Sequence, residues 1–149
     1  MQRRSFLKGT LAGSAVAVAV GAGLLSPRAV LAAWPKAAFE AKSVNDAMSK
    51  LFGSADNTPS ADIKIKAPDI AENGAVVPVS VRTSMSNVDS IAVIAEKNGT
   101  PLASNFKLSA NTVPNVSTRI KMGKTSDVIA VVKANGKAYS ARKNVKVTI

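Results

Sequence analysis

Residues 67–81 read Ala-Pro-Asp-Ile-Ala-Glu-Asn-Gly-Ala-Val-Val-Pro-Val-Ser-Val, a polar turn that leads into a β-strand pattern. Val77, Val79 and Val81 occupy alternate positions, which places the three valines on one apolar face of the strand. Pro78 has no N–H group to donate to a neighbouring strand, so it predicts that this strand is bulged or lies at a sheet edge. The stretch therefore predicts a β-protein in which one face of this strand is buried.

The rest of the chain after the polar segment Ser54–Ser60, which reads as a linker, is a series of short strands and turns. Asn-Gly pairs at 73–74, 98–99 and 135–136 favour tight turns, because both residues tolerate positive φ. Short strands at this spacing predict a mostly β fold, either a sandwich or a barrel, and of these we expect an immunoglobulin-like β-sandwich over residues 54–149. The candidate strands are Asp62–Lys66, Val76–Arg82, Ser90–Ala95, Leu102–Leu108, Val116–Met122, Val128–Lys133, Lys137–Ala141 and Val145–Ile149.

An amphipathic helix is predicted ahead of the sandwich, over Pro35–Phe52 within an N-terminal segment 33–53. Proline suits the first helical turn, and Gly53 suits the stop. Such a helix either packs on its own domain or docks on a partner subunit, and one apolar face fits both interpretations. That face consists of Ala37, Ala41, Val44, Met48 and Leu51.

The N-terminus predicts an export leader over residues 1–32. Arg3 and Arg4 precede Ser-Phe-Leu-Lys, which is the twin-arginine pattern, and an uncharged stretch rich in Ala, Gly and Val follows. The small residues that end at Ala32 suit cleavage, so the mature protein is predicted to begin at Ala33. The apolar run is too short for a comfortable membrane span, which needs about 20 residues. We therefore expect a periplasmic protein without a stable membrane anchor.

Composition argues against an enzyme. The chain contains no histidine and no cysteine, and it has no nucleophile elbow, metal-loop spacing or phosphate loop. Asp69 and Glu72 are close in sequence and are interpreted as part of an exposed turn. We therefore expect no cofactor and no catalytic residue.

The mature chain is basic. Four of the 20 basic residues lie in the leader, so 16 remain against nine acidic residues and give a net charge of +7. Few aromatic side chains stand among these charges, and no nucleic-acid partner is expected. The cations of the final hairpin form either a solvated face or a surface for anionic adducts or an acidic partner. They are Lys133, Lys137, Arg142, Lys143 and Lys146.

Three stretches of the chain resemble the SoxY family, the covalent carrier subunits of bacterial thiosulfate-oxidising (Sox) systems. They are residues 67–81, Thr118–Met122 and Lys143–Ile149. The resemblance implies a periplasmic sulfur carrier with an immunoglobulin-like fold, paired with the subunit SoxZ and docking transiently to SoxAX, SoxB and SoxCD. Family members carry their sulfur intermediates on one cysteine in a Gly-Gly-Cys-Gly tail, which we expect to follow Ile149.

The end of the last strand is the expected base of that arm. Alternation predicts that Val147 and Ile149 anchor the arm by facing the core, whereas Lys146 and Thr148 face outward. The twin-arginine route moves folded proteins, and a chain without a cofactor gains most from it by preassembly with a leaderless partner. The alternative function is a non-catalytic periplasmic immunoglobulin-like module that binds a partner by strand addition.

Overall fold

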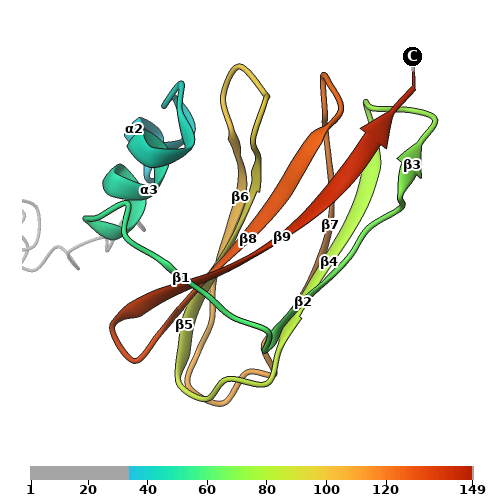
Figure 1. Ribbon diagram of the computed structural model, residues 1–149. Helices are drawn as coiled ribbons and strands as arrows, with labels where there is room; N and C mark the ends of the chain where they lie inside the picture. The colour runs from blue at the N-terminus through green and yellow to red at the C-terminus, as the bar shows by residue number, and fades with distance from the viewer. Residues whose placement is uncertain (1–33, 149) are drawn as a thin grey trace, which may run out of the picture. The chain divides into compact units, whose positions relative to one another are not determined.

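The strands of this protein form two sheets that face each other (Figure 1). The structure is a computed structural model that describes residues 34–148. The larger sheet has the strand order β1-β9-β8-β5-β6, with β3 beside β9, and the smaller sheet has the order β2-β4-β7. The predicted mostly β, immunoglobulin-like sandwich is confirmed. The strands are β1 (Thr58–Pro59), β2 (Ile63–Lys66), β3 (Ile70–Ala71), β4 (Val77–Thr83), β5 (Val88–Ala95), β6 (Leu102–Lys107), β7 (Asn115–Ile120), β8 (Ser126–Ala134) and β9 (Lys137–Val147).

The main hydrophobic core lies between the two sheets. Val77, Val79 and Val81 of β4 are at most 1% exposed, as their alternation predicted. Ile91 of β5 and Val132 of β8 belong to the same cluster and are fully buried. Each such side chain contributes about 1.5–3 kcal/mol by leaving water, so this layer holds the sandwich together without a disulfide.

Strand β5 is buried on both of its faces. Ile91 and Val93 face the core between the sheets, whereas Ala92 and Ile94 pack against the two helices, α2 (Lys36–Phe39) and α3 (Val44–Phe52). Burial on both sides explains why this strand reads as a continuous apolar run rather than an alternating one. Because α2 and α3 cover the outer face of the larger sheet, the predicted amphipathic segment packs on its own domain (Figure 1).

The prediction of one continuous helix over Pro35–Phe52 is wrong at residues 40–43. Ser43 has extended backbone angles, and its hydroxyl accepts a hydrogen bond from the Asp46 N–H (N···O 3.1 Å), so it caps a new helix. Because the segment is broken, the five predicted apolar positions do not share one face. Ala37, one of these positions, is exposed. Gly53 ends α3 as expected.

The prediction of an edge position for the strand that contains Pro78 is wrong for the strand as a whole. Strand β4 is the central strand of the smaller sheet. Its pairing with β2 ends at Ser80, opposite Lys66, whereas its pairing with β7 continues through Pro78 to Val77. Proline therefore stands where β4 has a neighbour on one side only, and its missing N–H group leaves no gap in the sheet.

Three other predictions need correction. The last two candidate strands form one strand, β9, and the short strands β1 and β3 lie in segments predicted to be linker and turn. The Asn-Gly pair at 73–74 joins strands of different sheets rather than a hairpin. The pair at 135–136 does form the tight β8–β9 hairpin turn, with φ values of 52° and 75°.

Candidate functional site

The end of strand β9 is fastened to the rest of the domain by β3. The Lys146 N–H donates to the carbonyl oxygen of Asp69 (N···O 2.9 Å), and the Thr148 N–H donates to that of Ala71 (3.0 Å). The two strands run parallel in this pairing. Segment 67–81 therefore supplies both a core strand, β4, and the short strand β3, which holds residues 146–148. We call these three residues the chain end.

A threonine from the β7–β8 loop holds the same chain end from another direction. The Val147 N–H donates to Oγ1 of Thr125 (N···O 2.9 Å), and the Thr125 hydroxyl donates to the carbonyl oxygen of Val147 (3.4 Å). The N–H groups of three successive residues, 146 to 148, thus all have hydrogen-bond partners. These contacts hold the backbone of residues 146–148 in place at the end of β9.

Close packing at Gly74 joins the loop after β3 to the same site. The Met122 N–H donates to the carbonyl oxygen of Gly74 (N···O 2.7 Å). A Cβ atom at position 74 would lie 2.4 Å from the carbonyl oxygen of Met122 and 2.8 Å from Cγ1 of Val147. Only glycine fits this position, because the first of these neighbours is backbone.

Two asparagines shape the loops around the chain end. The Asn98 side chain donates to the carbonyl oxygen of Lys121 (N···O 2.6 Å) and accepts from the Gly123 N–H (3.0 Å). The Asn73 side chain accepts from the N–H of Ala75 (2.9 Å), which closes the turn after β3. The loops that surround the chain end are therefore tied by side-chain hydrogen bonds to backbone.

Two shallow hollows flank the chain end. One, of about 340 Å³, lies between the loops and is lined by Glu72, Asn73, Gly74, Ala75, Lys121, Met122, Gly123, Val147 and Thr148. The other is mainly apolar and includes Pro68, Pro78 and two exposed aliphatic side chains, Ile70 (57% exposed) and Val76 (51%). Apolar surface therefore lies directly beside the end of β9.

Among the predicted site residues, Arg3, Arg4 and Ile149 lie outside the described residues. Val147 is half-buried and packs against the core between the sheets, whereas Lys146 is exposed. Thr125, Asn98 and the close contact at Gly74 were not predicted. The Asn-Gly pairs at 73–74 and 98–99 mark turns but not what the turns contact, and Thr125 has no such signal.

Stability should respond differently to substitutions at two adjacent positions. Val147→Ala is expected to lower the free energy of unfolding by about 1–3 kcal/mol, because methyl groups packed on the core are lost. Lys146→Ala should change it by less than about 0.5 kcal/mol, since that side chain is exposed. Thermal melts of both variants test this prediction. Equal small shifts would show that the end of β9 contributes little to the core.

The charges near this site are partly paired. Asp69 forms an ion pair with Lys143 (Oδ1···Nζ 3.0 Å), and Arg142 forms one with Glu96 (3.0 Å). Glu72 is exposed, in line with the interpretation of its segment as a solvated turn. Exposed pairs of this kind are worth at most about 1 kcal/mol. Because two cations of the final hairpin are paired, the interpretation of that hairpin as an ordinary soluble face is favoured.

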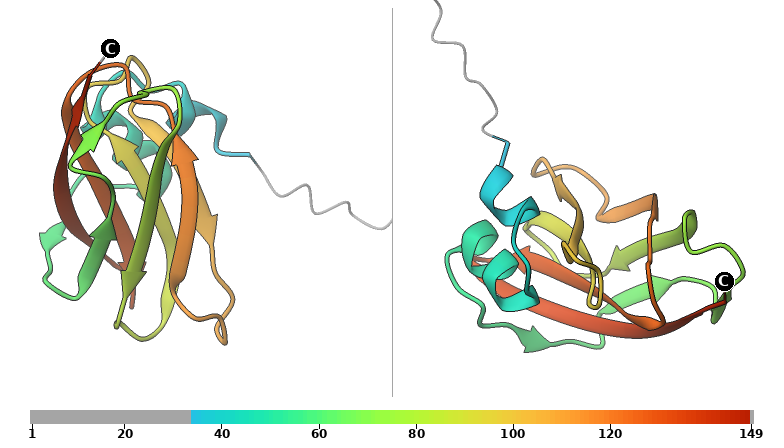
Figure 2. Two further views of the ribbon diagram at one scale, coloured as in Figure 1. Left: turned by 90° about the vertical axis from the view of Figure 1, so that its right-hand side faces the viewer. Right: turned by 90° about the horizontal axis from the view of Figure 1, so that it is seen from above.

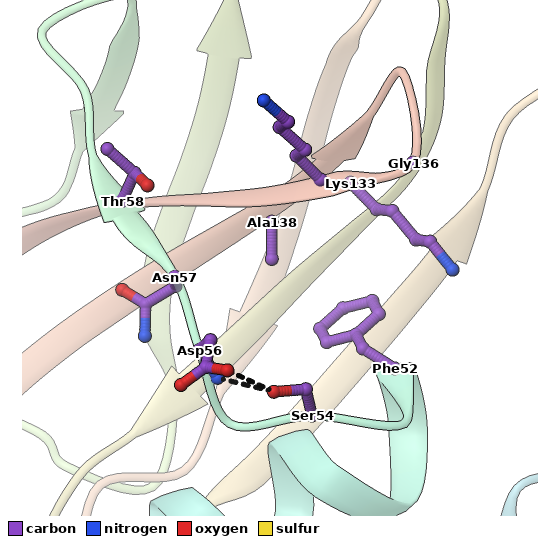
Figure 3. Close-up of a pocket in the computed structure, with 9 residues that line it drawn as sticks. Phe52, Ser54, Asp56, Asn57, Thr58, Lys133, Gly136 and Ala138 are labelled. Atoms are coloured by element: carbon purple, nitrogen blue, oxygen red, sulfur yellow. Dashed lines mark hydrogen bonds between the residues drawn. The ribbon is translucent and has the colours of Figure 1, made fainter.

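A further hollow lies at the other end of β9, where that strand begins (Figure 3). The Ser54 hydroxyl donates to the Asp56 carboxylate in it (O···O 2.9 Å), but the chain has no imidazole that could act as a base beside them. Residues 34–148 contain no cluster of three or more side chains suited to a metal ion. The hollow is lined by Phe52, Ser54, Asp56, Asn57, Thr58, Lys133, Gly136, Lys137 and Ala138.

No helix within residues 34–148 is long and apolar enough to cross a membrane. The fold and the chain-end contacts together define an immunoglobulin-like sandwich module whose C-terminal strand is fastened by surrounding loops. Comparison with known proteins identifies the family of this module. The family model of the sulfur oxidation protein SoxY matches residues 48–149, and the chain belongs to the SoxY family.

Solved structures agree with this assignment. The sulfur carrier protein SoxY from Chlorobium limicola f thiosulfatophilum is 43% identical, with a TM-score of 0.66 over 72% of this chain and 97% of that one. A superoxide reductase (neelaredoxin) from Ignicoccus hospitalis is 18% identical, with a TM-score of 0.51 over 58% of this chain and 80% of that one, and it shares the fold alone. A search of curated proteins finds no match. The chain is thus a sulfur carrier of the SoxY family and takes part in sulfur oxidation.

Proposed function

We propose that this chain is a periplasmic carrier of thiosulfate oxidation that holds sulfur intermediates covalently on a C-terminal cysteine arm. In this proposal the arm follows Ile149, because the 149 residues contain no cysteine. The carrier is not itself an enzyme. The observation that carries the proposal is the fastening of the chain end by residues 69–74 and Thr125, which provides a fixed origin for a mobile arm.

A fixed origin and a flexible arm suit a carrier. Glycine restricts the chain little, and each extended residue adds at most about 3.6 Å, so five residues reach roughly 17 Å. The thiolate of a cysteine on such an arm is a good nucleophile for sulfur compounds. Because the origin is fixed, docking of the sandwich would place the thiol at a high effective concentration in a partner's cleft.

The proposal includes the partners of the carrier. The chain pairs with SoxZ and presents its arm in turn to SoxAX, SoxB and SoxCD. Export occurs in the folded state through the twin-arginine leader 1–32, which is followed by the mature chain. The family assignment supports this set of partners, and the arginine pair supports the export route.

Mass spectrometry of the full gene product tests the carrier function. Joining the thiolate to thiosulfate releases two electrons, so the incubation contains thiosulfate, the purified Sox enzymes and an oxidised electron acceptor. The carrier is expected to gain mass in sulfur-containing steps, and dithiothreitol should remove this mass. A variant with serine in place of the arm cysteine is the control and should stay unmodified. A wild-type chain that gains no removable mass would contradict the proposal.

One observation favours the second candidate function, a binding module that acts by strand addition. Among the described strands, β6 lies at one edge of the larger sheet and pairs only with β5. Its residues 103–106 are partly exposed, so its outer edge is open to another strand. This function needs no thiol, and the mass measurement therefore separates it from the carrier.

A further inference from the structure

The outer face of the smaller sheet is strongly cationic. Lys64 and Lys66 of β2, Arg82 of β4 and Arg119 of β7 are all exposed on it. Strands β2, β4 and β7 contain no aspartate or glutamate. Within residues 34–148 none of these four cations takes part in an ion pair, although other cations of the domain do. We call these four residues the cationic face.

The register of the strands brings like charges together on this face. Lys64 lies directly opposite Arg82 in the β2–β4 pairing. Like charges at directly opposite positions of an antiparallel pair are destabilising. Between the charged residues, the hydroxyls of Ser80 and Ser117 hydrogen-bond to each other (O···O 2.8 Å), and neither carries a negative charge that could pair with the cations. Within the described residues, no ion pair neutralises the charges of this face.

The cationic face is uncovered and extends toward the chain end. Helices α2 and α3 pack on the larger sheet, on the other side of the sandwich (Figure 2). At one end of the face Arg119 lies opposite Pro78, which lines the apolar hollow beside the chain end. Exposed Lys121 follows directly after β7 and lines the neighbouring hollow. A partner seated on this face would therefore lie next to the origin of the arm.

We propose that the cationic face is the docking surface for a protein partner with a carboxylate-rich surface, which receives the arm while it is docked. This inference rests on the proposed carrier function. Exposed arginines suit such a partner, because a guanidinium binds a carboxylate with two parallel hydrogen bonds. Complementary charge mainly accelerates encounter, which suits a carrier that visits several enzymes in turn.

The chemistry of the face favours a protein over a lipid surface. Surfaces that bind membranes combine cations with aromatic or large aliphatic side chains that enter the lipid. The exposed uncharged positions on β4 and β7 are Pro78, Asn115 and Ser117, which are not such anchors, and the exposed Ile70 and Val76 lie beside the face rather than among its cations. The four cations are also spread over three neighbouring strands, where separate carboxylates of a folded partner can pair with each of them.

Association kinetics test the docking surface without using the thiol. The full-length carrier, its SoxZ complex and purified SoxAX, SoxB and SoxCD are the probes, and the variant is K64Q/K66Q/R82Q/R119Q. At about 0.02 M salt its association rate constant with at least one enzyme should fall tenfold or more, and the difference should shrink at about 0.5 M salt. A matched variant, K42Q/K97Q/K107Q/K137Q, removes four exposed cations elsewhere and should change the rate less than twofold.

Further measurements distinguish a failure of the docking surface from a failure of the carrier function. The melting temperature of the cationic-face variant should equal or exceed that of the wild type, since like-charge contacts are removed. Equal association rates for both variants would overturn the docking surface, even if the arm carries sulfur. A different outcome is that the cationic-face variant associates with the enzymes at the wild-type rate but no longer binds vesicles that contain phosphatidylglycerol. That result would overturn the docking surface in favour of a membrane-binding surface. Absence of adducts on the wild-type arm would contradict the carrier function but not charge-dependent association.

Discussion

Gly74→Ala is expected to lower the free energy of unfolding by about 3 kcal/mol, a large effect for one methyl group. The added Cβ would stand 2.4 Å from the backbone carbonyl oxygen of Met122, so the loop after β3 must move away from the β7–β8 loop. That movement also pushes on Val147 and weakens the hold on the end of β9. Chemical denaturation measures the loss of stability. Faster amide hydrogen exchange at Lys146 and Thr148 would show that the chain end has been released.

Gly99→Ala is the matched control for this prediction. Gly99 lies in the β5–β6 hairpin, and a Cβ atom added there meets nothing within 4 Å. Its free energy of unfolding should change by less than about 0.5 kcal/mol. If the two glycine variants were equally stable, the contact between the loop at 74 and Met122 would be too weak to fasten the chain end.

Replacing Arg3 and Arg4 by lysine is expected to abolish or strongly slow export of the chain, because the pathway recognises the arginine pair. If SoxZ reaches the periplasm only as a passenger, it should remain in the cytoplasm as well. Immunoblots of periplasmic and cytoplasmic fractions for both subunits measure this effect. Arg28→Lys, which changes the remaining arginine of the leader, should leave export intact. Normal periplasmic SoxZ beside a retained carrier would contradict co-export.

Local patterns in the sequence were sufficient for most of the sandwich. The alternation of Val77, Val79 and Val81 predicted their burial, and the Asn-Gly pair at 135–136 predicted the last hairpin, because both depend on near neighbours. Whether Pro78 has a neighbouring strand on one side or on both depends on where β2 ends. No residue close to Pro78 in the sequence indicates that position. The cap at Ser43 is a local signal, but the apolar periodicity on both sides of it conceals the break.

The candidate site was harder to predict because it is assembled from distant segments. Alternation placed Val147 toward the core and Lys146 toward solvent. Thr125, 22 positions before Val147 in sequence, and Asn98, 23 positions before Lys121, contact the site only after the sheets have formed. Strand β3 has two residues, too few for any period to appear. Its partner on β9 becomes evident only from the register.

The pairing of β8 with β9 has a mechanical consequence. The two strands pair along the whole length of β8, from Ser126 opposite Val145 to Ala134 opposite Lys137. In the proposed carrier, an enzyme that holds the loaded arm while the sandwich diffuses away would pull along β9. Such a pull loads the hydrogen bonds of this ladder in shear, all together, rather than opening them one after another. The long pairing of β8 with β9 therefore resists tension applied at the end of β9.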